Sequence, residues 1–264
     1  MNIRNLFAVI VAFFINTNMW AWAQEEGEVI TNDVTSELIL GGEVSAVTYN
    51  RYHTDDGHVW HDERVGQLDL WIDIKGGFWI DLWGSVATEG RHDSENFGDE
   101  IDFGVGKTTE VTLSDEAIAN IDIGLYYFDI AEVTKFNSDT DAWRIHMEAT
   151  GEGCLAIEDV LKPFVKVQAY KASTESWDSL IFVGVKGDYG ITDKLSLDAR
   201  AYTMYDSGLW DNVSGYLVGA EIAAHYALFE DLTADISVGH TDPMSSGDYR
   251  SEQTTWGFGL TYSF

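Results

Sequence analysis

The chain has 264 residues, with 45 acidic against 15 basic side chains and a formal net charge of −30 at pH 7. Proteins bind nucleic acid through Lys and Arg that neutralise phosphate, so this balance argues against a nucleic-acid partner. Aromatic residues make up 13% of the chain and apolar residues 45%, which favours a folded chain over an acidic disordered one.

The first 23 residues have the layout of a secretory signal peptide. Arg4 supplies a positive charge, Leu6–Ile15 is an apolar run, and Ala21 and Ala23 are small residues before the expected cleavage at Gln24. The run is too short to span a bilayer as a helix. We therefore expect a signal peptide over residues 1–23, an N-terminal periplasmic segment over 24–35 and a β-barrel over 36–264. The alternative for the first segment is a buried N-terminal helix.

The rest of the chain has no apolar stretch as long as a transmembrane helix. Only helices and closed barrels satisfy the backbone within lipid, so the mature chain is either soluble or a membrane β-barrel. Twelve segments with alternating apolar and polar residues predict strands. In chain order they cover residues 38–46, 68–74, 78–86, 101–105, 121–127, 143–149, 165–169, 181–185, 195–201, 218–224, 234–238 and 256–264.

Connection lengths favour a barrel over a soluble β-sandwich. Short connections are expected at Lys75–Gly77, Asp188–Lys194 and Ala227–Asp231, and they alternate with longer acidic ones over residues 51–64, 88–100, 205–212 and 241–253. Outer-membrane barrels have short periplasmic turns and long outer loops. Two connections on the short side, Thr108–Asn120 and Gly151–Lys162, are longer than this rule expects. An even strand count places both termini on the periplasmic side.

Aromatic residues near the predicted strand ends support the same fold. They fall on the apolar faces, as the interfacial girdles of membrane barrels do. The set is Tyr127, Trp143, Tyr189, Tyr226, Trp256, Tyr262 and Phe264. In a sandwich, large aromatic residues should lie in the middle of strands at least as often. The fold class predicted is thus all-β, a transmembrane antiparallel barrel of about twelve strands.

Residues Asp81–Lys107 carry a family resemblance. Trp83, Gly84 and Ser85 are followed by an acidic connection and then by Glu100, Ile101, Asp102, Phe103 and Gly106. This arrangement resembles the TorF-like family of porins, in which a strand with Trp and Ser precedes a strand of the form E-(apolar)-D-(aromatic)-x-x-G. The resemblance implies an outer-membrane barrel with a pore function, and it implies no catalytic residues.

Catalytic and metal sites were weighed against a plain barrel. His146 and His225 face the interior by parity and are the candidates for a lipid hydrolase, but no G-x-S-x-G motif accompanies them. His53, His58 and His61 lie in one acidic connection and could bind Zn or Cu. We expect no resident metal and no cofactor. Divalent cations at the acidic connections are a further candidate partner.

The predicted interior surface is charged. Its pore-lining candidates are Asp69, Asp73, Asp81, Asp102, Asp122, Arg144, Glu148, Lys166, Arg200, Glu221, Asp235, Trp71, Trp79 and Trp83. With Glu43, Asp198 and Lys186, ten acidic side chains face four basic ones. Opposite charges could pair and plug the interior, or surplus carboxylates could line a water-filled path that prefers cations. We favour the second arrangement. The aromatic side chains either contact cations and sugar-like solutes or fill a tight barrel.

The sequence therefore predicts a porin-like channel in the bacterial outer membrane, passing small and preferably cationic solutes. A non-conducting structural or adhesive barrel is the alternative, followed by a barrel lipid hydrolase. Expected partners are outer-membrane lipid, small solutes and the barrel-assembly machinery. The terminal Phe264 resembles the aromatic signal read by that machinery, and at the interface it also anchors the last strand.

Overall fold

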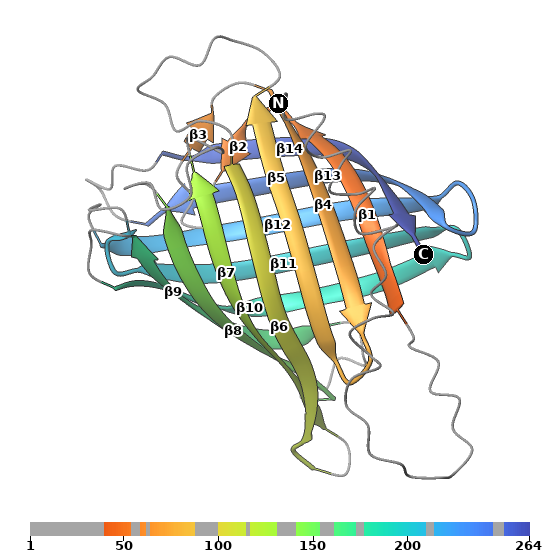
Figure 1. The fold of residues 1–264 in the computed structure, drawn as a ribbon, viewed down its shortest axis with the longest axis horizontal. Coiled ribbons are helices and arrows are strands. Elements are labelled where there is room, and N and C mark those ends of the chain that lie inside the picture. The colour runs from red at the N-terminus through yellow and green to blue at the C-terminus, as the bar shows by residue number, and fades with distance from the viewer. Residues whose placement is uncertain are drawn as a thin grey trace, which may run out of the picture. The chain divides into compact units, whose positions relative to one another are not determined.

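The structure is a computed structural model that describes residues 40–53, 59–61, 64–87, 100–114, 117–130, 141–153, 161–172, 177–209, 214–244 and 251–264. Within these residues twelve antiparallel strands close into one barrel (Figure 1), which confirms the predicted fold class and strand count. The chain divides into residues 1–37 and a second unit, Leu38–Phe264, that contains the barrel. The predicted signal peptide and periplasmic segment lie outside the described residues and remain predictions.

The strands follow one another around the barrel in chain order. They are β1 (Leu40–Tyr49), β4 (Val65–Ile74), β5 (Phe78–Ala87), β6 (Glu100–Thr112), β7 (Ile118–Ile130), β8 (Ala142–Glu152), β9 (Lys162–Ala172), β10 (Asp178–Thr192), β11 (Leu195–Asp206), β12 (Gly215–Ala227), β13 (Leu232–Pro243) and β14 (Gln253–Ser263). Two short strands, β2 (Tyr52–His53) and β3 (Val59–His61), form a separate sheet between β1 and β4 in the sequence. Among the described residues, no helix is long and apolar enough to cross a membrane.

Several strands are longer than the sequence predicted. Thr112 of β6 still pairs with Ile118 of β7, so the expected connection Thr108–Asn120 shrinks to residues 113–117. Likewise, β10 continues to Thr192 and leaves only Asp193–Lys194 as a turn. The prediction of a long connection at Thr108–Asn120 was therefore wrong, because ladder hydrogen bonds continue beyond the alternating apolar core. Gly151–Lys162 lies partly outside the described residues.

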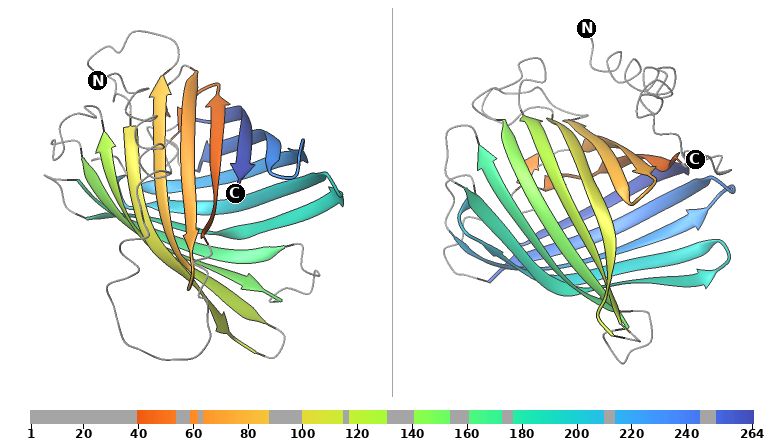
Figure 2. Two further views of the ribbon diagram at one scale, coloured as in Figure 1. Left: turned by 45° about the vertical axis from the view of Figure 1, so that its right-hand side comes forward. Right: turned by 60° about the horizontal axis from the view of Figure 1, so that its bottom comes forward.

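We call the end of the barrel with the short connections the turn end and the opposite end the loop end. The turn between β4 and β5 needs glycine, because Gly76 and Gly77 have φ of 91° and 80°. The chain terminus is at the turn end too, since Phe264 and Gly42 exchange backbone hydrogen bonds of 2.9 and 3.1 Å. β1 and β14 thus close the barrel (Figure 2).

The outer face of the barrel is apolar and exposed. Residues at alternate positions, such as Ile145, Val183, Ile236 and Phe258, are each at least 45% exposed. Six of the seven aromatic residues predicted to form girdles are also exposed: Trp143, Tyr189, Tyr226, Trp256, Tyr262 and Phe264. A surface of this composition is suited to contact with lipid.

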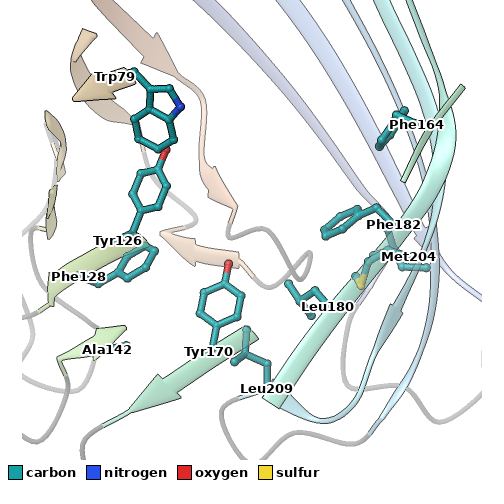
Figure 3. Close-up of a cluster of buried hydrophobic side chains, with 11 residues drawn as sticks. Trp79, Tyr126, Phe128, Ala142, Phe164, Tyr170, Leu180, Phe182, Met204 and Leu209 are labelled. Atoms are coloured by element: carbon teal, nitrogen blue, oxygen red, sulfur yellow. The ribbon is translucent and has the colours of Figure 1, made fainter. Parts of the chain in front are cut away.

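The inner face contains more apolar packing than the sequence suggested. A cluster of buried side chains lies inside the barrel (Figure 3): Trp79, Tyr126, Phe128, Ala142, Phe164, Tyr170, Leu180, Phe182, Met204, Leu209 and Leu217. Leu209 follows β11 and is only 3% exposed, because Asp206 accepts hydrogen bonds from the backbone N–H groups of Gly208 and Leu209 and turns the chain inward. Small barrels are commonly filled by their own side chains, and this one is filled in part.

Candidate functional site

Inward-facing glycines leave room for large rings inside the barrel. A Cβ atom on Gly124 would lie 2.5 Å from the ring of Trp79, and a Cβ atom on Gly104 would collide with the ring of Tyr126. The two rings therefore cover the inner surface of β6 and β7. Glycine within a strand often marks such a close approach.

Trp79 is the centre of a stacked group. Its ring lies 4.7 Å from that of Trp71 and 5.9 Å from that of His146, the latter nearly parallel at 8°. Asp122 accepts hydrogen bonds from Trp79 Nε1 at 2.7 Å and from Thr108 Oγ1 at 2.8 Å, and it also contacts His146 Nε2. Asp122 and His146 thus hold Trp79 against the wall.

A cavity of about 920 Å³ remains beside these rings. Its lining begins at the loop end with Gln67 and Leu209 and reaches Glu152 and Asp188 at the turn end. The cavity therefore extends along the barrel between its two ends. Ser237 and Gly239 of β13 line it as well, and their small size leaves this side of the interior open.

The predicted pore-lining residues divide into two groups. Those on the cavity wall are Asp81, Asp102, Arg144, Lys166, Arg200, Glu221 and Trp83. Those that face the interior outside the cavity lining are Asp69, Asp73, Asp122, Glu148, Asp235, Trp71 and Trp79. The packing of the rings decides which of these residues reach the cavity.

Basic side chains on β8–β11 are mostly paired with nearby carboxylates. Arg200 makes two hydrogen bonds with Glu221, at 2.7 and 2.8 Å. Lys186 pairs with Glu148, and Lys162 lies 3.2 Å from Glu152. These pairs largely neutralise one another within their own wall of the barrel.

Basic side chains of this wall also lie over aromatic rings. Lys166 Nζ is 5.2 Å from the ring centre of Phe182, and the guanidinium carbon of Arg200 is 5.5 Å from that of Tyr202. A cation within about 6 Å of a ring face is attracted by the ring quadrupole. The rings therefore help to keep these long side chains against the wall.

Opposite these pairs, β4–β6 carry a group of carboxyl side chains. We call Asp69, Asp81, Glu100 and Asp102 the carboxylate cluster. Tyr126 donates a hydrogen bond to Asp81, and Arg144 of β8 attracts both Asp81 and Asp102. The guanidinium of Arg144 in turn lies over the rings of Tyr126 and Phe128.

Parity missed several residues of the cavity wall, among them Glu100, Lys162, Tyr49 and Leu209. Glu100 begins β6 one residue before the predicted strand, and Lys162 begins β9 three residues early. Tyr49 ends β1 beyond its predicted limit, and Leu209 lies in a connection. Extending each alternating pattern by a few residues would have found the first three. Leu209 carries no such signal.

The two interior histidines have aspartate partners. His225 Nδ1 lies 2.7 Å from Asp235 and its Nε2 lies 3.2 Å from Asp198, while His146 contacts Asp122. Among the described side chains, no group of three or more His, Cys, Asp or Glu is placed to hold a metal ion. The side chains of His53, His58 and His61, Cys154 and most of the acidic connections lie outside the described residues.

Among the solved structures that are similar to this fold are porins. The KdgM porin has a TM-score of 0.54 at 12% identity, covering 84% of this chain and 99% of its own. The KdgM porin in complex with disordered oligogalacturonate has a TM-score of 0.54 at 11% identity, covering 85% of this chain and 99% of its own. The NanC porin has a TM-score of 0.53 at 10% identity, covering 84% of this chain and 98% of its own. At these identities the likeness shows the fold, which agrees with the predicted location in the bacterial outer membrane.

No family model matches the chain, and no curated protein matches its sequence. The resemblance of Asp81–Lys107 to the TorF-like porins therefore stays a prediction. In the structure this segment contains most of β5 and the first half of β6, which pair with each other from Phe78 opposite Lys107 to Ser85 opposite Glu100.

Proposed function

We propose that the protein is an outer-membrane channel for the passive diffusion of small solutes. The observation that carries the proposal is the cavity, whose lining extends from Gln67 at the loop end to Asp188 at the turn end. The wall is polar and charged over much of its area, as an aqueous path requires. The porin fold of the similar structures supports the same role.

We further propose that the channel prefers cations. The basic residues Lys162, Lys186 and Arg200 are each paired with a carboxylate, so their charges are largely cancelled locally. On the facing wall lie the carboxyl groups of the cluster, of which Asp81 and Asp102 are attracted by Arg144 of β8. A negative surplus along a narrow path attracts cations and repels anions.

The path is tested by thiol labelling during conductance recording. Residue 237 lines the cavity on β13, whereas the neighbouring Ile236 points outward and is 58% exposed. Ser237→Cys and Ile236→Cys, both in a Cys154→Ser background, are refolded into planar bilayers and treated with a charged methanethiosulfonate reagent. We expect discrete current steps that shrink only in Ser237→Cys. No current steps, or the same response from both variants, would contradict the proposal.

A further inference from the structure

The carboxylate cluster is assembled by the register of three neighbouring strands. Asp69 of β4 and Asp102 of β6 both pair with Trp83 of β5. Asp81 lies two residues before Trp83 on β5 and therefore on the same face. Cross-strand and diagonal neighbours on one face lie about 5–8 Å apart. The three carboxyl groups thus occupy one small area of wall, of which Asp81 and Asp102 line the cavity.

Several buried oxygens of these carboxyl groups have no hydrogen-bond partner among the described residues. Asp102 is 7% exposed and Asp81 is 9% exposed. One oxygen of each, and one of Asp69, is buried and has no hydrogen-bond partner within the described part of the chain. Ser85 Oγ, beside them on β5, is in the same condition. Buried polar atoms are nearly always hydrogen-bonded, so the unpartnered carboxylate oxygens of Asp81 and Asp102 mark a place on the cavity wall for a ligand with N–H donors.

The local positive charge does not balance the cluster. The guanidinium of Arg144 attracts Asp81 and Asp102 and His146 attracts Asp81, while Glu100 and Asp69 place further carboxyl groups beside them. Confining several carboxylates beside one cation is costly unless another cation joins them. Arg144 also indicates which chemistry the wall accepts, since its guanidinium lies 4.1 Å from the ring centre of Tyr126.

The spacing favours an organic cation over a metal ion. Within the described residues, the carboxyl groups are not placed for three or more of them to hold one metal. An ammonium or guanidinium group carries several N–H donors and can reach acceptors that are further apart. Trp83 lines the cavity beside the cluster, as do Tyr126 and Phe128, whose rings already contact the guanidinium of Arg144.

We propose that the carboxylate cluster is a binding site in the channel for solutes with an ammonium or guanidinium group. This inference deepens the proposed function, because it names the class of solute that the channel would hold on its way through. Hydrogen bonds from the N–H groups to Asp81 and Asp102 would select it over alkali ions and over quaternary ammonium ions.

The test uses the refolded full chain in detergent and then in planar bilayers. Methylguanidinium is the probe, and tetramethylammonium is the control cation without N–H donors. We expect methylguanidinium at millimolar concentration to raise the thermal midpoint and to reduce the sodium current saturably, with at least a tenfold weaker effect from tetramethylammonium. The thermal measurement needs no current, so it separates failure of this site from failure of the channel proposal.

Variants locate the site. Asp102→Asn and Asp81→Asn should weaken the methylguanidinium effect at least tenfold, whereas Asp242→Asn, which removes a carboxylate from the exposed side of β13, should leave it unchanged. Heat-modifiable migration on a gel checks that each variant is folded. Equal effects of the two cations on the native chain, or full methylguanidinium binding in folded Asp102→Asn, would overturn the proposal. A cluster that instead shares protons internally would give the first of these outcomes.

Discussion

The guanidinium group of Arg144 lies over the ring of Tyr126, with 4.1 Å between the guanidinium carbon and the ring centre. Tyr126 in turn donates a hydrogen bond to Asp81 and lies over Gly104, where a Cβ atom would collide with its ring. A glycine on β6 thus makes room for a ring on β7, and that ring holds a cation of β8 beside the carboxylates of β5 and β6. The charge pattern of the cavity depends on this packing.

Removing the Arg144 charge should increase the negative surplus of the cavity. We expect Arg144→Gln to shift the reversal potential in a salt gradient further toward cation preference and to lower stability by about 1–3 kcal/mol, since buried carboxylates lose their partner. Arg144→Lys keeps the charge and serves as the control for selectivity. Unchanged selectivity in Arg144→Gln, with the protein folded, would show that this residue does not set the field.

A double-mutant cycle tests the fit between Gly219 and Tyr202. A Cβ atom on Gly219 would collide with the side chain of Tyr202, since its three nearest atoms are two ring carbons and the hydroxyl oxygen of that residue. We expect Gly219→Ala to lower stability in denaturant by about 1–3 kcal/mol in the native background. In a Tyr202→Ala background Gly219→Ala should lower stability by almost nothing. The coupling energy between the two positions should therefore equal most of the loss seen in the native background. Additive costs would contradict the packing described.

The pairing of β1 with β14, which closes the barrel, should depend on Gly42. A Cβ atom there would collide with the backbone oxygen of Trp71 and lie 2.9 Å from the ring of Phe264, whereas at Gly41 the nearest atom is 3.8 Å away. We expect Gly42→Ala to reduce the folded fraction in heat-modifiable gels and Gly41→Ala to leave it unchanged. Equal folded fractions of the two variants would argue against close packing at Gly42.

Deletion of Phe264 should impair assembly more than conductance. The backbone of Phe264 exchanges hydrogen bonds with that of Gly42 at the turn end, and its side chain is exposed on the outer face. We expect less membrane-inserted protein in cells, with normal current steps from the fraction that does insert. Normal amounts of heat-modifiable, inserted protein without Phe264 would contradict its role as an assembly signal.

Breaking the Arg200–Glu221 pair should change ion selectivity in the opposite direction to removing the Arg144 charge. Its two hydrogen bonds hold a carboxylate against a guanidinium on the cavity wall. We expect Glu221→Gln to expose the Arg200 charge and to reduce cation preference, measured as a smaller reversal potential. The double variant with Arg200→Gln should restore the native value, because it removes one charge of each sign.

Alternation along the strands was enough to predict the barrel, because a strand places successive side chains on opposite faces and lipid requires one apolar face. It assigned both Trp79 and Asp122 to the inner face, and in the structure Trp79 Nε1 donates a hydrogen bond to Asp122. It could not predict that Trp79 would be buried at 2% exposure with Asp122 bonded to it. That outcome depends on glycines of two other strands, Gly106 and Gly124, over which the ring lies.

Leu209 illustrates a second limit. It lies in a connection, where period-two patterns give no information, and its burial depends on the bonds from Gly208 and Leu209 to Asp206. The predicted strand ends were short for a related reason. Thr112 and Ile118 are paired through the backbone, which requires no apolar alternation.

The reversal potential of single channels in a potassium chloride gradient tests the central claim most directly. Purified, refolded protein is inserted into a neutral-lipid bilayer so that lipid charge does not contribute. The carboxylate cluster and the paired basic wall predict discrete steps with a reversal potential of the sign set by cation preference, smaller in Asp102→Asn. A complete absence of steps, or a reversal potential of the sign set by anion preference, would contradict the account.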